Sequence, residues 1–169
     1  MKKILFLVSI LLIYLLIGNV ATSYNLIPED AIRIRVIANS DSPEDQSIKE
    51  EVRRKLETFF YEKLKDVKGI SNAKSTIIAS IPEAEQIIID TLGNNNYNLH
   101  YGMNYFPDKE YKGIQYKAGY YQSLAVTLGR GLGTNWWCIL FPPLCLLDGT
   151  GVEEVEYRSL VADIVQKYF

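Results

Sequence analysis

The side chains that could do chemistry in this chain gather in one stretch, residues 129 to 148. It holds both cysteines, both tryptophans and an adjacent proline pair, namely Cys138, Cys145, Trp136, Trp137, Pro142 and Pro143. A cysteine becomes a nucleophile when a nearby base or positive charge lowers the pKa of its thiol. Cys138 instead lies in the apolar sequence WWCIL, which favours burial and a raised pKa. A thiol hydrolase site, with His100 as base and Asn135 orienting it, is therefore the weaker interpretation.

Three glycines open the same stretch, at Gly129, Gly131 and Gly133. A phosphate-binding loop would need a following Lys-Ser/Thr pair and a helix, and the sequence offers neither. A turn or bulge between two strands accounts for the glycines. The single histidine of the chain excludes a metal site built on two histidines within it. The sequence therefore predicts no catalytic residue, no metal site and no cofactor.

Contact with another protein explains this stretch better than catalysis does. Residues 136 to 147 carry no charge and combine tryptophan, phenylalanine and proline, which partner-binding patches use. In a strand, Trp136 and Trp137 would point to opposite faces, so that one anchors the core and the other is available to a partner. The formal net charge of -2 gives no basic surface for nucleic acid, so no nucleic-acid partner is expected.

The first 23 residues read as an export segment. Lys2 and Lys3 precede an apolar run from residue 4 to residue 17 that only Ser9 interrupts. As a helix this run would span roughly 21 Å, short of the ~30 Å hydrocarbon core, which suits a signal peptide better than a permanent anchor. We expect residues 1–23 to be a signal peptide or an uncleaved membrane anchor, which would then be the only membrane contact. Residues 24–169 form the exported domain.

Export changes what the two cysteines can do. Outside the cytoplasm, Cys138 and Cys145 can form a disulfide, which would close a loop of about eight residues and stabilise the fold by roughly 2.5 kcal/mol. The alternative is two buried free thiols, a common fate of cysteine. The sequence leaves both open.

The elements that carry these residues begin with an alternating strand. Ile32, Ile34 and Val36 alternate with Arg33 and Arg35, a period of two with one apolar face. The arginines are expected on a solvated face, with the gripping of an acidic partner as the alternative.

A polar turn and a long helix come next. Asn39, Ser40 and Asp41 either make local hydrogen bonds within a strand-to-helix turn or contact a cation or a partner. Ser42 reads as the N-cap of a helix over residues 43 to 65, and Asp45 approximates a capping box.

The remaining pattern predicts a helical region capped at Ser71 and Ser80, strands over residues 97–105 and 120–128 joined by a polar connection, and a short strand from residue 136 to residue 141. Residues 152–169 read as a closing helix. This order favours an α+β fold: a single two-layer domain, with a mainly antiparallel sheet and helices packed on one face.

Two signatures in the chain resemble a known family. Residues 33–42 (RIRVIANSDS), followed by Asp45, Gln46, Lys49, Val52 and Arg53, resemble the opening signature of stage II sporulation protein R. Residues 133–145 (GTNWWCILFPPLC) resemble its closing signature. The resemblance covers about residues 33 to 148. Residues 117–121 read KAGYY where the family pattern has Pro-Ala-Gly-Glu-Tyr, which puts a role for that acidic residue in doubt.

The resemblance implies a signalling protein of endospore-forming bacteria that is not itself an enzyme. It would be made in the forespore and exported into the space between the forespore and mother-cell membranes. There it would trigger a membrane-embedded aspartic protease of the mother cell, which processes the precursor of sigma factor E. An exported envelope thiol hydrolase using Cys138 and a structural envelope protein are the alternatives.

Which residues touch the receptor protease follows neither from the residues nor from the resemblance. Our hypothesis places the contact on the closing signature and the turn after the first strand. Its residues are Asn135, Trp136, Trp137, Phe141, Pro142 and Pro143, with Asn39, Ser40 and Asp41 nearby.

Overall fold

A four-stranded mixed sheet forms one layer of the protein. The computed structural model describes residues 30–111, 114–143 and 168. Its strands β1 (Ile32–Ile37), β2 (Tyr97–Phe106), β5 (Gly119–Leu128) and β6 (Asn135–Phe141) lie in the order β2-β5-β1-β6. The pair β1–β5 is parallel, and the pairs β2–β5 and β1–β6 are antiparallel. The first described strand of the sequence is therefore a central strand of the sheet.

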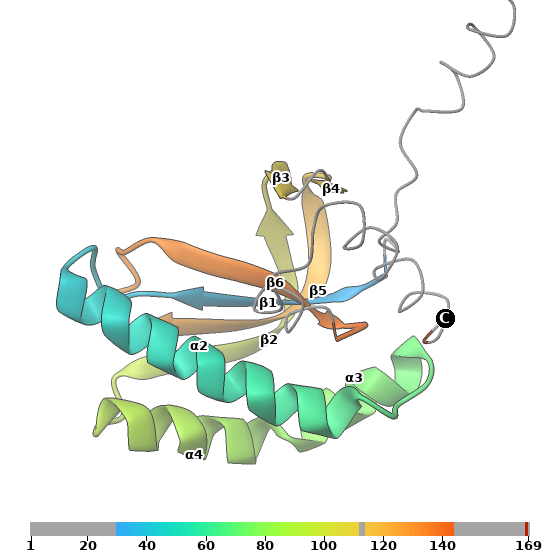
Figure 1. The fold of residues 1–169 in the computed structure, drawn as a ribbon, viewed down its shortest axis with the longest axis horizontal. Helices are drawn as coiled ribbons and strands as arrows, with labels where there is room; N and C mark the ends of the chain where they lie inside the picture. Colours follow the sequence, from blue (N-terminus) through green and yellow to red (C-terminus); the bar gives the residue numbers. More distant parts are fainter. Residues whose placement is uncertain (1–29, 112–113, 144–167, 169) are drawn as a thin grey trace, which may run out of the picture.

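Three helices form the second layer. They are α2 (Pro43–Leu64), α3 (Ile70–Ala79) and α4 (Ile81–Leu92), and Figure 1 shows all three on one side of the sheet. The predicted two-layer α+β fold, with helices on one face of the sheet, is confirmed. Within the described parts of the chain, no helix is both long and apolar enough to cross a membrane. The predicted signal or anchor segment, residues 1–23, lies outside the described residues.

Two predicted helix starts, at Ser42 and Ser80, are confirmed in position, and the start at Ser71 is wrong. Ser42 caps α2, because its Oγ accepts a hydrogen bond of 3.1 Å from the backbone N–H of Asp45. The helix α3 starts after Gly69 (φ 78°) with no side-chain cap, so Ser71 lies inside it. Ser80 is the N-cap residue of α4, but it is buried, has helical backbone angles (φ -90°, ψ -2°) and its side chain makes no cap hydrogen bond. The chain therefore turns from α3 into α4 almost without leaving helical geometry.

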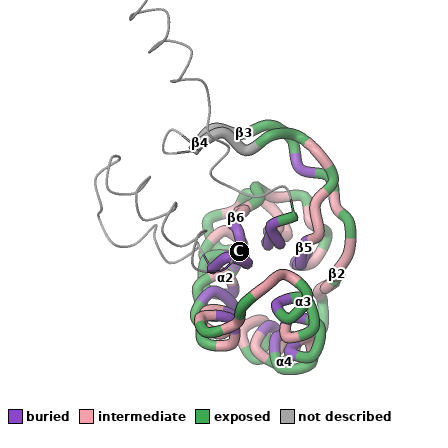
Figure 2. The backbone as a smooth tube through the Cα atoms, turned by 90° about the vertical axis from the view of Figure 1, so that its right-hand side faces the viewer, coloured by how far each residue is buried: buried purple, intermediate pink, exposed green. Residues whose placement is uncertain are grey.

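The core lies between the two layers, where Figure 2 places most of the buried residues. The row Ile32, Ile34 and Val36 is fully buried and faces the helices, as the alternating pattern predicted. Opposite it lie apolar side chains of the helices, including Val52, Leu56, Phe60, Leu64, Ala73, Ile77, Ala84 and Ile88. These residues recur at helical spacing, so burial of this stripe holds the helices on the sheet.

The opposite face of the sheet differs from the prediction. Arg33 was expected in solvent, yet only 5% of it is exposed. Its guanidinium lies 3.5 Å from the ring centroid of Tyr121 and 5.1 Å from that of Phe106. Arg35 lies 5.7 Å from the Phe106 ring, and burial lowers the pKa of Arg35 below its ordinary value. The cause is the length of β2 and β5, whose ends curve away from the helices and carry these aromatic rings (Figure 1).

Two further parts of the chain were predicted less completely. The polar connection between the long strands contains a small hairpin, β3 (Lys109–Tyr111) with β4 (Ile114–Tyr116). The predicted closing helix, residues 152–169, lies outside the described residues except for Tyr168. The Tyr168 ring packs edge to face on Phe141, with centroids 5.4 Å apart.

Candidate partner-binding site

Two loops meet at one end of the sheet and form a continuous surface. We call residues 38–42, between β1 and α2, together with residues 129–134, between β5 and β6, the two-loop platform. Backbone hydrogen bonds join them: Leu132 N–H donates to the Asn39 carbonyl (3.1 Å) and Gly133 N–H to the Ala38 carbonyl (3.0 Å). The opening and closing signatures of the sequence are thus in direct contact, although they lie about ninety residues apart.

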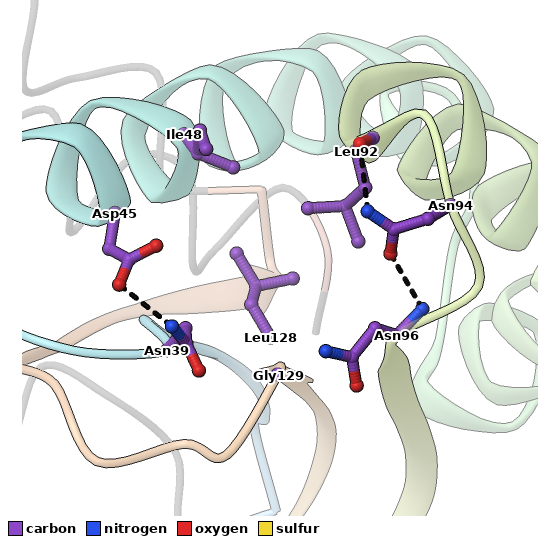
Figure 3. A pocket seen from close by; sticks show the side chains of 8 residues that line it. All are labelled: Asn39, Asp45, Ile48, Leu92, Asn94, Asn96, Leu128 and Gly129. Carbon is purple, nitrogen blue, oxygen red and sulfur yellow. Dashed lines mark hydrogen bonds between the residues drawn. The ribbon is translucent and has the colours of Figure 1, made fainter.

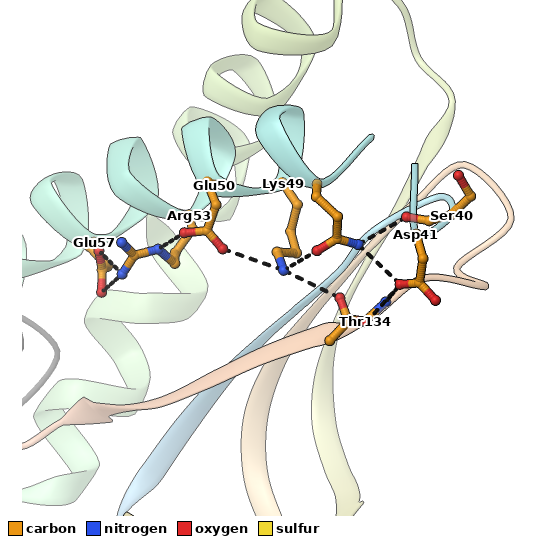
Figure 4. A network of polar contacts seen from close by, with 8 residues as sticks. Ser40, Asp41, Lys49, Glu50, Arg53, Glu57 and Thr134 are labelled. Carbon is orange, nitrogen blue, oxygen red and sulfur yellow. Dashed lines mark hydrogen bonds and ion pairs between the residues drawn. The ribbon is translucent and has the colours of Figure 1, made fainter. Parts of the chain in front are cut away.

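Asp41 joins the two loops of the platform through side-chain hydrogen bonds. One carboxylate oxygen accepts hydrogen bonds from the hydroxyl and the backbone N–H of Thr134, both 2.6 Å long. These bonds stabilise the charged carboxylate and lower the pKa of Asp41 below its usual range. Gln46 donates to the same oxygen (3.3 Å) and to the Ser40 carbonyl (2.9 Å). Figure 4 shows this network continuing along α2 through Lys49.

Lys49, on α2, connects this helix to the platform. Only 5% of this residue is exposed, and its Nζ donates to the Gln46 side-chain oxygen at 2.7 Å and to the Thr134 carbonyl at 3.5 Å. It also forms an ion pair with Glu50 at 3.4 Å. A buried ammonium group needs such partners, so Lys49 holds both loops at the start of α2.

Asn39 and Ser40 also direct their polar groups into the platform. The side-chain oxygen of Asn39 accepts from the Arg130 N–H (3.0 Å), and its amide donates to Asp45 (2.8 Å). The Ser40 hydroxyl donates to the same Asp45 oxygen at 2.5 Å. The bond from Ser40, followed by the bond from Asn39, lowers the pKa of Asp45. The turn is therefore rich in local hydrogen bonds, as one of the two interpretations of the sequence expected, and its contact with a partner stays a prediction.

The glycines allow the loops to approach this closely. A Cβ on Gly133 would lie 2.2 Å from the Ser40 carbonyl oxygen, well inside van der Waals contact. Gly129 and Gly131 have positive φ angles of 55° and 64°, which side-chain-bearing residues rarely adopt. The interpretation of these glycines as a turn between two strands is confirmed.

The two tryptophans point to opposite faces, as predicted. Trp136 packs against the core on the helical side, and the Arg53 guanidinium lies 5.0 Å from its ring centroid. Arg53 is held there by Glu50 at 2.7 Å and Glu57 at 3.0 Å. Trp137 lies on the other face and packs edge to face on Phe106, with centroids 5.6 Å apart. Both rings are half-buried, so each can anchor the fold and still present an edge to a partner.

The predicted contact residues fall into two groups. Asn39, Ser40 and Asp41 lie beside the start of β6, where Asn135 is exposed and Trp136 follows it. Phe141, Pro142 and Pro143 lie at the other end of β6, roughly 20 Å along the strand, and all three are buried. The structure brings the first group together and does not bring the second group to it.

Sequence reasoning missed three features of this end of the molecule. Leu132, one of the platform residues, is 66% exposed. Arg53 stacks on Trp136, and an arginine on the polar side of a helix gave no signal of that contact. A cavity of about 210 Å³ opens beneath the platform, lined by Asn39, Asp45, Ile48, Leu92, Asn94, Asn96, Leu128 and Gly129 (Figure 3). Its lining comes from four separate segments, so no local motif marks it.

The geometry gives no support to a Cys138–His100 pair. Cys138 is paired with Ile34 on the helical side of β6, and its thiol lies 3.8 Å from the Ile139 carbonyl oxygen. His100 is exposed on β2, at the far side of β5 and β1 from β6, and points to the opposite face. Cys145 lies outside the described residues, so the disulfide stays a prediction. In the described ranges, no three His, Cys, Asp or Glu side chains gather to hold a metal ion.

Replacing Asp41 by asparagine should lower stability in a pH-dependent way. The folded state lowers the pKa of Asp41, so its contribution is present above the unfolded value of about 3.9 and is lost as the pH falls through the folded value. Urea unfolding should show wild type more stable than the variant at pH 7, with the difference closing below about pH 4. Asp66→Asn removes the same charge just beyond the far end of α2 and is the control. A difference that does not change with pH would contradict the role of the carboxylate.

The comparisons with known proteins agree with the two signatures. The family model for stage II sporulation protein R matches residues 28–151. Stage II sporulation protein R of Bacillus subtilis (strain 168) is 38% identical over 138 residues, which is 79% of this chain and 62% of that protein. The chain thus matches less than two thirds of the length of that relative. No solved structure matches. The protein belongs to the stage II sporulation protein R family.

Proposed function

We propose that this protein is an exported signal of sporulation that activates a membrane-embedded aspartic protease of the mother cell. That protease then processes the precursor of sigma factor E. Membership of the family carries the proposal, because the family match includes both signatures and nearly all of the described residues. Residues 1–23 would direct export of the protein from the forespore into the intermembrane space, where it would act. There it would be either secreted or held at the membrane by an uncleaved N-terminus.

The surface we assign to the receptor is the two-loop platform with Asn135 and Trp136. Its loops are joined by backbone and side-chain hydrogen bonds, so little conformational entropy would be lost on binding. Leu132 offers an exposed apolar side chain, and Asp41 and Thr134 are exposed polar residues of the same platform. Protein interfaces usually combine apolar side chains with polar groups in this way. Trp137 is the second candidate contact, on the other face of β6.

Substitutions on this surface should block activation in protein that is still folded and exported. Trp136→Ala, Trp137→Ala and Leu132→Asp are the test variants. A tryptophan at the centre of an interface typically contributes about 2 kcal/mol or more to binding, so Trp136→Ala should weaken receptor activation roughly thirtyfold. The measurement is cleavage of the sigma factor precursor in sporulating cells, with the amount of exported variant followed in parallel.

The matched control is Ile78→Asp, which replaces an apolar residue of α3 that is 45% exposed and distant in sequence from both loops. It should leave cleavage unchanged. If all three surface variants activate the receptor as well as wild type at equal protein levels, the platform and β6 are not the contact surface. If sporulating cells that lack this protein still cleave the sigma factor precursor, the proposed function is rejected.

A further inference from the structure

Among the described strands, β2 forms an edge of the sheet, and its own sequence carries none of the usual protection. It pairs with β5 in an unbroken register of ten residues, from Tyr97↔Leu128 to Phe106↔Gly119. Its sequence, YNLHYGMNYF, contains no proline and no Asp, Glu, Lys or Arg. Among the residues that the structure describes, no strand pairs with its outer edge. Natural proteins normally blunt such an edge with charges, proline or a bulge, so a bare edge of this length is suited to pairing with another strand.

The apolar side of β2 is covered along only half of its length. Tyr97, Leu99 and Tyr101 pack against the core beneath the helices. Met103 and Tyr105 continue the same row beyond the helices, and 57% and 52% of these residues are exposed. A strand added to β2 would therefore meet a covered apolar half and an uncovered apolar half.

We propose that β2 pairs antiparallel with β2 of a second copy of this protein, about a two-fold axis at Gly102. An axis perpendicular to the sheet keeps the same faces together and makes the contact self-complementary. Met103 then lies opposite Tyr101 of the second copy, and Tyr105 lies opposite its Leu99. The uncovered half of each strand lies beside the helix-covered half of the other. The two sheets join into one continuous sheet through about ten main-chain hydrogen bonds.

The polar face of β2 is compatible with the same register. Its side chains are Asn98, His100, Asn104 and the buried Phe106, with Gly102 in the middle. Asn98 would lie opposite Phe106 of the second copy. His100 would lie opposite Asn104 of the second copy, a pair able to form a hydrogen bond. No pair of like charges is placed across the axis, and such pairs are what ordinarily discourage a strand from pairing with itself. This two-fold match favours a second copy over an unrelated extended segment.

Sedimentation equilibrium of the full-length protein in mild detergent tests the proposal. Wild type should show a concentration-dependent equilibrium between monomer and dimer. Met103→Lys should weaken association at least tenfold, because it places two like-charged side chains on diagonal positions across the axis, where the residues lie about 7–8 Å apart. Leu132→Lys adds the same charge at a residue of similar exposure away from β2 and should leave association unchanged. Circular dichroism checks that each variant is folded.

A charge-swap experiment tests the register itself. Met103→Glu should also weaken association of the protein with itself, whereas an equimolar mixture of Met103→Lys and Met103→Glu should recover it. A wild type that stays monomeric, a dimer that persists in Met103→Lys, an equal loss in Leu132→Lys, or a mixture that does not associate would each overturn the proposal. Failure of the dimer proposal would not contradict the proposed receptor surface, because Met103 lies outside the two-loop platform.

Discussion

Replacing Phe106 by alanine is expected to lower the free energy of unfolding by about 3–5 kcal/mol. Phe106 is fully buried at the end of β2, on the face of the sheet away from the helices. Its ring contacts Trp137 and Tyr121, with centroids 5.6 Å and 6.2 Å away, and lies beneath the Arg33 guanidinium. Alanine would leave a cavity and would also remove one of the two described aromatic rings that contact the buried Arg33 guanidinium. Urea unfolding followed by tryptophan fluorescence measures the loss.

The neighbouring residue provides the control. Tyr105 is also aromatic and lies on the same strand, but it points to the other face and is 52% exposed. Its described ring contact is with Tyr120, at 5.6 Å. Tyr105→Ala should therefore cost no more than about 1 kcal/mol. Equal losses in the two variants would mean that the aromatic cluster does not stabilise this face of the sheet.

Replacing Gly133 by alanine is expected to destabilise the protein by about 2–3 kcal/mol and to separate the two loops of the platform. The added Cβ would lie 2.2 Å from the Ser40 carbonyl oxygen and 2.5 Å from its carbon, both backbone atoms that cannot rotate away. Relief of the clash must move the loop, which weakens the bonds from Thr134 to Asp41. Unfolding experiments should show the loss of stability, and the receptor assay should show reduced activation at temperatures where the variant is still folded.

The control variant Gly93→Ala distinguishes the effect of a steric clash from that of backbone strain. Gly93 ends α4 with φ 67°, and no atom lies within 4 Å of the position a Cβ would take. Gly93→Ala should therefore cost only the strain of a left-handed alanine, about 1–2 kcal/mol, and should not affect activation. If Gly133→Ala proves less destabilising than Gly93→Ala and activates normally, the close approach of the two loops is not important.

The elements with strong local signals were predictable. The alternation from Ile32 to Val36 marked β1, and Ser42 and Pro43 marked the start of α2. The opposite orientations of Trp136 and Trp137 followed from strand geometry alone once a strand was assumed. The predicted start at Ser71 is wrong, and Ser80 takes the predicted N-cap position without a side-chain cap hydrogen bond. Serine in a helical pattern does not show whether the backbone leaves helical geometry there.

Features that depend on distant segments were not predictable. Alternation shows that Arg33 and Arg35 share a face, but not that Phe106 and Tyr121 cover it. Hydrophobic pattern likewise carries no information on the parallel pairing of β1 with β5.

For the candidate site, proximity in sequence was misleading in one case and unhelpful in another. Phe141 to Pro143 follow the tryptophans closely, yet an extended strand carries them roughly 20 Å away, and they are buried. Asp41 and Thr134 are distant in sequence and hydrogen-bonded in space.

The central position of β1 sets the order in which the sheet can assemble. This strand is the first of the described strands to be synthesised, but its neighbours are residues 123–127 and 135–141. Until the chain is complete to Phe141, β1 lacks at least one of its partners, and such non-local pairing is slow to form. In a nascent chain the sheet therefore stays incomplete until its last described strand, β6, has been synthesised. In the export that we propose for this protein, this delay would keep the polypeptide unfolded until most of it has crossed the membrane.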